Sequence, residues 1–450
     1  MNRLSRRRFL RALSAGGALY AFGRTPGTVM AQTAALDGFS DYKSLVCVFL
    51  LGGNDSWSVV VPRSDPEYAA YAASRQNLAI AQDTLLPIEP LEPDGAAYGI
   101  HPSMPGVQSL FETGRCAVIA NVGPLIEPTT LEQFQQGSVS LPPQLFSHND
   151  QQDQWHTLRG RQALRSGWAG RIADLLAAQT ASQQLALNIS LSGTTLFQAG
   201  ETAAPYVMGA TGTAFSALGN TASTLARRAA FERIVYADHP DVYGRAFADV
   251  QDRALRYSTL VNSALAAAPA LTTTFPASPL ATQLKTVARM IAVRDRLGMS
   301  RQIYFVAAGG FDTHDAQLPN QPKLLSDVSA SLAAFYNATV ELGVSSSVTT
   351  FTHSDFGRTL TSNGDGSDHA WGGVQLVIGD AVRGRTFYGR YPLLELGGPD
   401  DVGGGRIIPE LSIDQYAATL AKWLGVDLQQ LPTVAPNLGN FAAQDLGFML

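Results

Sequence analysis

Five short runs of apolar and β-branched residues, separated by helical patterns, organise this chain. Each run ends at glycine or a small polar residue, which is typical of strands covered on both faces of a parallel sheet. The runs cover residues 45–51, 116–120, 303–307, 348–352 and 374–378. Apolar residues at helical spacing predict helices over 105–113, 322–342 and 412–424, the last with Ser412 as its N-cap. Strands that alternate with helices predict an α/β fold.

The stretch from about residue 221 to residue 297 has a different pattern. It is rich in Ala, Arg and Leu at helical spacing, and prolines at 240, 269, 276 and 279 interrupt it. We expect a helical insertion between two strands, lying as a cap or a flank on the α/β domain. The insertion carries no obvious chemistry.

The N-terminus has the features of an export signal. Residues 5–11 read Ser-Arg-Arg-Arg-Phe-Leu-Arg, a mildly apolar stretch follows over 12–22, and residues 29–31 offer a cleavage site. This pattern predicts a twin-arginine signal peptide over 1–31, with a basic amphipathic tail as the alternative. We expect export by the twin-arginine translocase and a periplasmic or extracellular location for the domain at 32–450. No later segment is a continuous apolar run of about 18 residues, so we expect no stable membrane anchor.

Composition and charge narrow the class of protein. Hydrophobic residues make up 45% of the 450 residues, which indicates a globular chain with a large core. The formal net charge is −5, and removing the six arginines of residues 1–31 leaves 26 basic and 37 acidic residues, a net charge of −11. Such an acidic chain is unsuited to binding nucleic-acid phosphates. Cys47 and Cys116 fall in apolar runs, so we expect buried free thiols, with a disulfide as the alternative.

Acidic residues follow three of the predicted strands, at Asp55, Asp312 and Asp355. Because the carboxyl ends of parallel strands form the ligand crevice of an open α/β sheet, these side chains should meet there. Three converging carboxylates repel one another unless a cation neutralises them. The pattern predicts a metal site, and the alternative is a set of separate turn or N-cap aspartates.

Histidines strengthen the metal hypothesis. Two short motifs, Asp312-x-His314 and Asp368-His369, lie beside glycines near these strand ends. Imidazole together with carboxylate suits Zn²⁺, Mn²⁺ or Fe, whereas carboxylate alone suits Mg²⁺ or Ca²⁺. We expect one or two divalent metals. For either motif alone, an ordinary Asp–His hydrogen bond is the alternative.

A third polar cluster, residues 146–156, follows the second strand. Within it, Ser147 is compatible with a nucleophile and with the N-cap of a helix that begins near His148, and the local sequence favours the cap. A metal nearby would favour the nucleophile, because coordination lowers the pKa of a hydroxyl. Arg358, three residues after Asp355, is compatible with bidentate binding of a tetrahedral anion or with a surface ion pair.

These pieces, in this order, resemble the alkaline phosphatase and sulfatase superfamily. More closely, they resemble a family of twin-arginine-exported, sulfatase-like bacterial proteins of unknown function. The resemblance covers the chain from about residue 43 to the C-terminus. It rests on six motifs taken as a set: Gly-Gly-Asn-Asp at 52–55, Phe-Ser-His-Asn-Asp at 146–150, Gly-Trp-Ala-Gly-Arg at 167–171, Gly-Phe-Asp-Thr-His at 310–314, Ser-Asp-Phe-Gly-Arg at 354–358 and Asp-His-Ala-Trp-Gly-Gly at 368–373.

The resemblance implies a doubly wound, mostly parallel sheet with metals at the strand ends. It implies hydrolysis or transfer of phosphate or sulfate esters by a hydroxyl nucleophile, with Ser147 as the first choice and Thr129 or Thr130 in reserve. The implied metal ligands, to which we add Asp368 as the neighbour of the last histidine, are Asp55, Asp312, His314, Asp355, Asp368 and His369. For the same reaction we expect His148 or Asp150 as proton carriers or further ligands, and Asn54 and Arg358 as binders of the ester's free oxygens.

Three features set this chain apart from the superfamily pattern. Phe356 stands where a His or Asn often follows the strand-end aspartate, the Asp312-x-His314 spacing is compressed, and no cysteine lies in a sulfatase context. Two hypotheses follow. The first is an exported, metal-dependent hydrolase of a small phosphate or sulfate ester. The alternative is a catalytically silent periplasmic binding or assembly protein that keeps the fold.

Overall fold

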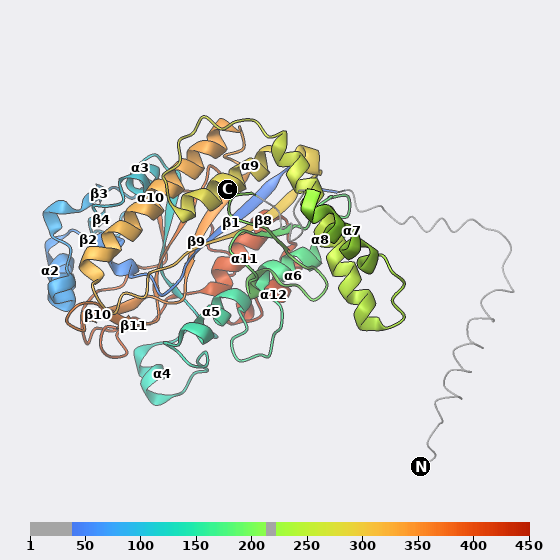
Figure 1. Cartoon of the computed structure of the whole chain (residues 1–450). Coiled ribbons are helices and arrows are strands. Elements are labelled where there is room, and N and C mark those ends of the chain that lie inside the picture. The colour runs from blue at the N-terminus through green and yellow to red at the C-terminus, as the bar shows by residue number, and fades with distance from the viewer. Residues whose placement is uncertain (1–37, 213–221) are drawn as a thin grey trace, which may run out of the picture. The chain divides into compact units, whose positions relative to one another are not determined.

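The computed structural model of the protein describes residues 38–212 and 222–450 (Figure 1). The predicted signal peptide at 1–31 lies outside the described residues, as does the first residue of the predicted insertion, and export stays a prediction. Among the described helices, none combines the length and the apolar character needed to cross a membrane.

A nine-stranded mixed sheet forms the centre of the described chain. Its order is β13-β5-β12-β9-β1-β8-β6-β7, and β14 pairs with β5. The strands of this sheet are β1 (Lys43–Leu50), β5 (Cys116–Gly123), β6 (Asn188–Ser190), β7 (Tyr206–Val207), β8 (Arg301–Ala308), β9 (Val348–Ser354), β12 (Gly373–Ile378), β13 (Phe387–Tyr388) and β14 (Leu411–Ser412). Smaller sheets consist of β2 (Val60–Pro62), β4 (Tyr98–Ile100) and β3 (Leu86–Ile88), and of β10 (Arg358–Ser362) with β11 (Ser367–His369).

Strand directions confirm the predicted α/β sheet and add one exception. The first apolar run, β1, pairs in parallel with both β8 and β9, as expected for a central strand. In contrast, β12 runs antiparallel to β9 on one side and to β5 on the other. The carboxyl ends of β1, β5, β8 and β9 therefore share one edge of the sheet. The N-terminal end of β12 joins them at that edge.

Helices cover both faces of this sheet (Figure 1). Alternation along β1 sends Val46 and Val48 to the face covered by α3, α9 and α10, and Cys47 and Phe49 to the face covered by α6, α11 and α12. The helices are α2 (Asp65–Arg75), α3 (Pro105–Glu112), α4 (Leu131–Gln136), α5 (His148–Thr157), α6 (Trp168–Leu175), α7 (Ala222–Val235), α8 (Val242–Ala266), α9 (Pro279–Ala292), α10 (Gln317–Glu341), α11 (Ile413–Leu424) and α12 (Leu431–Val434).

Two of the three predicted helices begin where the sequence places them, and one begins earlier. Ser412 caps α11 in a capping box, as expected. Helix α10 starts at Gln317 and carries Pro322 in its interior. Hydrogen bonds to Asp55, which follows β1, hold the extra N-terminal turn of α10. Gln317 donates to the Asp55 carboxylate, and Gln321 donates to the Asp55 carbonyl at 2.9 Å.

The two cysteines are free and buried. They lie in different core clusters, Cys116 with α3 and α10 and Cys47 with α6 and α11. Burial raises the pKa of both thiols. Both side chains therefore stay protonated and pack as small hydrophobic groups.

Candidate metal centre

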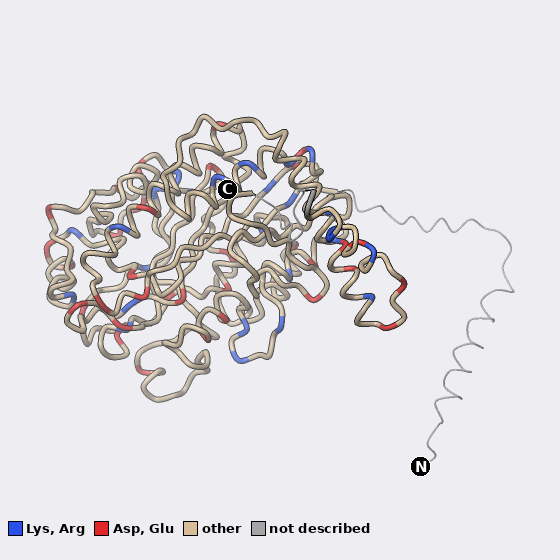
Figure 2. Tube along the Cα trace, in the orientation of Figure 1, with Lys and Arg blue, Asp and Glu red and all other residues tan. Residues whose placement is uncertain are grey.

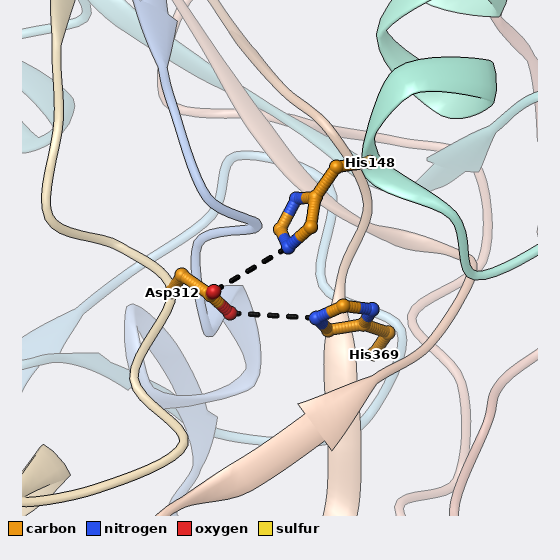
Figure 3. Close-up of side chains that lie close together, drawn as sticks. All are labelled: His148, Asp312 and His369. Atoms are coloured by element: carbon orange, nitrogen blue, oxygen red, sulfur yellow. Dashed lines mark ion pairs between the residues drawn. The ribbon is translucent and has the colours of Figure 1, made fainter.

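The candidate site lies where the loops after β8 and β9 meet the start of α5 and the β10–β11 hairpin. Asp312 follows β8, His148 is the first residue of α5, and His369 is the last residue of β11. His369 reaches this edge because β12, which follows it, enters the sheet in the antiparallel direction. Chain segments far apart in the sequence thus contribute one side chain each (Figure 3).

Three side chains could hold a metal ion together. The ligand atoms of His148, Asp312 and His369 all lie within 4.8 Å of one another. His148 Nε2 is 3.5 Å from Asp312 Oδ2, and His369 Nε2 is 3.4 Å from Asp312 Oδ1 (Figure 3). A tetrahedral ion with bonds of about 2.0–2.1 Å holds its ligand atoms roughly 3.3 Å apart. The observed spacing therefore fits such an ion.

A third histidine, His314, lies beside Asp312 and His369. Its Nε2 lies 3.1 Å from Asp312 Oδ1 and 2.9 Å from His369 Nε2. Two neutral imidazoles cannot share such a contact through two lone pairs without repulsion. A cation or a proton between them removes that repulsion.

The outward Nδ1 atom of each histidine is already bound to the protein. His148 Nδ1 lies 2.6 Å from Asp355 Oδ2 and His314 Nδ1 lies 3.1 Å from Asp368 Oδ1. His369 Nδ1 lies 2.7 Å from the carbonyl oxygen of Phe146. Because carbonyl and carboxylate oxygens only accept, these contacts place the proton on Nδ1. Each Nε2 then presents a lone pair to the centre, as metal-ligating histidines do.

Burial and neighbouring charges keep the donors in the form that binds a cation. Burial lowers the pKa of His369, the Phe146 carbonyl opposes this effect through its hydrogen bond, and the neighbouring His148, Arg358 and His314 side chains lower the pKa further. Burial would raise the pKa of Asp312, but Arg358 outweighs that effect through a hydrogen bond and its charge, so the pKa lies below the usual 3.8. At neutral pH, His369 is therefore neutral and Asp312 is ionised.

Arg358 forms an ion pair with Asp312 in this structure. Its side chain is buried, and Nη1 donates to Asp312 Oδ1 at 2.9 Å and to the Gly52 carbonyl at 3.0 Å. Its remaining nitrogens donate to Ser367. The guanidinium was predicted to hold substrate oxygens, yet each of its nitrogens has a protein partner here, so this geometry favours a positioning role.

Asp355 and Asp368, both predicted ligands, lie behind histidines. Asp355 is fully buried and accepts from His148, from Gln152 Nε2 at 3.0 Å and from the Gly52 amide at 3.2 Å. Asp368 accepts from His314. Carboxylates in this position orient a ligating imidazole and raise its basicity.

Asp55 and Asn54 are buried at the end of β1, with partners of their own. The Asp55 carboxylate forms a fully buried ion pair with Arg75 on α2 and accepts from Ser58 Oγ at 2.9 Å. Asn54 binds Ser354 Oγ through its backbone amide at 2.7 Å, and its side-chain oxygen is buried without a partner among the described residues. Arg75 balances the charge of Asp55, while Asp55 Oδ1 is buried without a hydrogen-bond partner among the described residues, so a role of Asp55 as a metal ligand stays a prediction.

The two glycines before Asn54 let β1 approach the site closely. A Cβ on Gly52, at φ +117°, would lie 2.3 Å from the Asp312 nitrogen, and one on Gly53, at φ +80°, would lie 2.2 Å from Phe356 Cε2. The Phe356 ring packs against His148 and His369, with ring centroids 4.9 and 4.5 Å apart. Phe356 thus forms an apolar wall of the site.

Ser147 occupies the N-cap position of α5 without using its side chain as a cap. Its hydroxyl instead donates to Asp150 Oδ2 at 2.9 Å. Of the reserve candidates, Thr130 caps α4 in a capping box, and Thr129 donates to the Glu127 carbonyl at 3.0 Å. Among these hydroxyls, Ser147 alone is paired with a carboxylate in the described contacts.

Some residues of the site had no signal in the sequence. Arg75 and Gln152 look like ordinary helix residues, and only the fold shows that they contact Asp55 and Asp355. Phe146 contributes a main-chain oxygen from a left-handed conformation with φ 75°, which no side-chain motif reveals.

The chain matches one sequence family and is similar to several solved structures. A family model described as "Protein of unknown function (DUF1501)" matches residues 42–439. No curated protein matches the sequence. The crystal structure of the lipoteichoic acid synthase LtaP from Listeria monocytogenes is similar at 8% identity and a TM-score of 0.33, covering 87% of this chain and 74% of that one. The C-terminal periplasmic domain of EcEptC from Escherichia coli, in complex with Zn, is similar at 12% identity and a TM-score of 0.25, covering 76% and 74%.

Proposed function

This chain belongs to the DUF1501 family, and for it we propose the function of an exported, metal-dependent hydrolase of small phosphate or sulfate esters. One observation carries the proposal: three imidazole Nε2 atoms and one carboxylate converge, and the outward atom of each imidazole is held by the protein. Donors fixed in this way are arranged for a cation.

The residues that would hold the ion are His148, Asp312 and His369, with His314 beside them. A bound divalent cation supplies a Lewis acid that polarises an ester oxygen and lowers the pKa of a nearby hydroxyl. Nitrogen and oxygen donors together suit Zn²⁺, Mn²⁺ or Fe. The paired Asp55 favours one ion over two.

Ser147 is the proposed nucleophile. It stands between Phe146, whose carbonyl binds His369, and His148, a proposed ligand, and its hydroxyl donates to Asp150. In the proposed reaction Ser147 Oγ bonds to phosphorus or sulfur and its proton passes to Asp150. The bond to the ester oxygen breaks, and the departing oxygen takes the proton from Asp150 and leaves as the alcohol. A water molecule then hydrolyses the serine ester and restores the hydroxyl.

The free oxygens of such a substrate need a cationic neighbour that is not fully engaged. Arg406 meets this need better than Arg358, because it is only partly buried. Its Nε donates to the His369 carbonyl at 3.2 Å, and its guanidinium lies 5.2 Å above the Phe146 ring. We therefore add Arg406 to Asn54 as a candidate for oxygen binding.

A catalytically silent binding protein is the second candidate. Two observations favour it. Asp55 is held in an ion pair with Arg75, and the Phe356 ring packs on His148 and His369. Such a protein would bind the ion and turn nothing over.

Metal content and turnover, measured on the same preparation, test the proposal. The protein is purified without chelator, its metals are measured by mass spectrometry, and aryl phosphates and aryl sulfates are assayed. We expect about one ion per chain, loss of metal and turnover in Asp312→Asn, and loss of turnover alone in Ser147→Ala. The control is Ser138→Ala, an exposed serine outside the site.

Each outcome decides between the candidates. Metal without turnover above the Ser147→Ala background favours the silent protein. A parent protein that retains no ion after soaking in Zn²⁺ or Mn²⁺ contradicts both. Turnover that survives in metal-free Asp312→Asn contradicts the proposed chemistry.

A further inference from the structure

We infer that the α7–α8 hairpin is a dimerisation surface that pairs with the same hairpin of a second copy of this chain. The inference is independent of the metal centre and of the proposed reaction. It starts from large apolar side chains that no described residue covers. Seven of them, each exposing more than half of its surface, lie between positions 225 and 250: Leu225, Ile234, Tyr236, Val242, Tyr243, Phe247 and Val250.

The apolar stripe of α8 runs out of the core into solvent. Tyr243, Phe247 and Val250 follow each other at helical spacing and are 85%, 56% and 52% exposed. The same line continues to Tyr257, which packs edge-on against Tyr206, and to Val261, which is fully buried. One half of the stripe thus has a partner in the fold, and the other half has none among the described residues. A helix that buries only half of its apolar stripe leaves the rest for another surface.

Helix α7 adds a groove beside this stripe. A shallow groove of about 640 Å³ is lined by Ala226, Ala229, Glu232, Arg233 and Tyr236. The lining combines two small alanines with one aromatic ring, and this open surface leaves room for a large apolar side chain. Tyr243 and Phe247 on α8 of a second copy are such side chains.

Charged residues of both signs lie along both helices of the hairpin (Figure 2). Arg227 and Arg233 on α7, and Asp249 on α8, are exposed and form no ion pair with any described residue. In a two-fold arrangement, α7 of one copy faces α8 of the other, so Asp249 of each copy can meet an unpaired arginine of the other copy's α7, while Arg245 on α8, which is exposed and also forms no ion pair with any described residue, must lie outside that contact. The interspersed signs favour a protein surface over an anionic lipid surface, which would select one sign.

The available area matches what a stable dimer needs. Each of the seven exposed side chains offers on the order of 100 Å² of apolar surface. Ile234 lies on the opposite face of α7 from Leu225 and Tyr236, so at most six of them can share one surface. These six supply about 600 Å² of apolar surface per copy, against the ~800 Å² of total surface per partner in a standard interface. Aromatic residues, which dominate binding energy at such interfaces, make up three of the seven.

Sedimentation velocity of the purified protein over a range of concentrations tests this inference. We expect a dimer, and we expect Tyr243→Ser/Phe247→Ser to raise its dissociation constant at least about tenfold. The matched control is Leu428→Ser, because Leu428 is 64% exposed and lies outside the hairpin. Arg233→Glu should weaken the dimer, and Arg233→Glu/Asp249→Arg should restore it.

Several results would overturn the inference. One is a parent protein that stays monomeric at all concentrations. Another is a dimer that survives the double serine substitution with an unchanged circular dichroism spectrum. Co-sedimentation of a monomeric parent with phosphatidylglycerol vesicles, lost in the double serine variant, would assign the patch to a membrane instead.

Discussion

Replacing Asp355 with asparagine tests whether His148 is held in place for a metal. Asp355 Oδ2 accepts from His148 Nδ1 at 2.6 Å and from Gln152 Nε2 at 3.0 Å, while Oδ1 accepts from the Gly52 amide at 3.2 Å. Asparagine has one acceptor where the carboxylate has two. If its amide nitrogen faces His148, the imidazole must accept at Nδ1 and carry its proton on Nε2, which blocks metal binding. If it faces Gly52, two N–H groups meet without a partner.

The magnitude follows from the role of such supporting carboxylates. Their loss lowers metal affinity by about 10–100-fold, or about 1.4–2.7 kcal/mol. The assay is a calorimetric titration of metal-free protein with Zn²⁺ against a competing chelator. Asp153→Asn is the matched control, because Asp153 lies on the same helix in a half-exposed pair with Arg159 at 3.6 Å.

One result would refute this reasoning. If Asp355→Asn and Asp153→Asn both bind Zn²⁺ as the parent does, with unchanged circular dichroism, then His148 is not an oriented ligand. Should Asp355→Asn fail to fold, His148→Gln supplies the same test, because it removes the ligand and keeps a polar group.

Three further predictions concern stability. Arg75→Met leaves the fully buried Asp55 charge without its partner, so the free energy of unfolding in urea should fall by about 3–5 kcal/mol; an unchanged midpoint would contradict the pairing. Burial raises the pKa of Asp414 from 3.8 to about 7, so the native state holds a proton that the unfolded state loses, and stability should fall between those pH values by up to about 1.4 kcal/mol per unit. Asp414→Asn should remove that slope in urea unfolding at pH 5 and pH 7, and a retained slope would point to another group. Gly53→Ala should cost at least about 1 kcal/mol in thermal unfolding and displace Phe356, because its Cβ would lie 2.2 Å from that ring; an unshifted melting temperature would show that the loop relaxes freely.

The fold was predictable because a strand that is covered on both faces of a sheet has a recognisable local sequence, a short run of apolar and β-branched residues. The runs that became β1, β8 and β9 are continuous stretches of apolar and β-branched residues, and their pairing is parallel as expected. The direction of β12 was not predictable, because an apolar run reports burial and carries no information on strand polarity. That polarity is what delivers His369 to the same edge as Asp312.

The candidate site was predictable in its residue types and less so in its contacts. Position after a strand was enough to place Asp312 and His314 at the edge of the sheet, and the family resemblance added His369 as a ligand. It could not separate a ligand from a supporting carboxylate, as Asp355 shows. Nor could it reveal the partner of Asp55, since Arg75 comes from a helix whose own sequence has no unusual feature.

The antiparallel entry of β12 has a consequence for when the proposed ion could bind during synthesis. A ribosome delivers His148 first, then Asp312 and His314, and His369 last of all. A nascent or truncated chain that ends just before β12 already contains all four donors, but it lacks the strand whose pairing with β5 and β9 fixes the segment after His369 at this edge. Ion uptake at this site would therefore be a late event that reports completion of the sheet. Limited proteolysis of apo and loaded protein would then distinguish finished chains from unfinished ones.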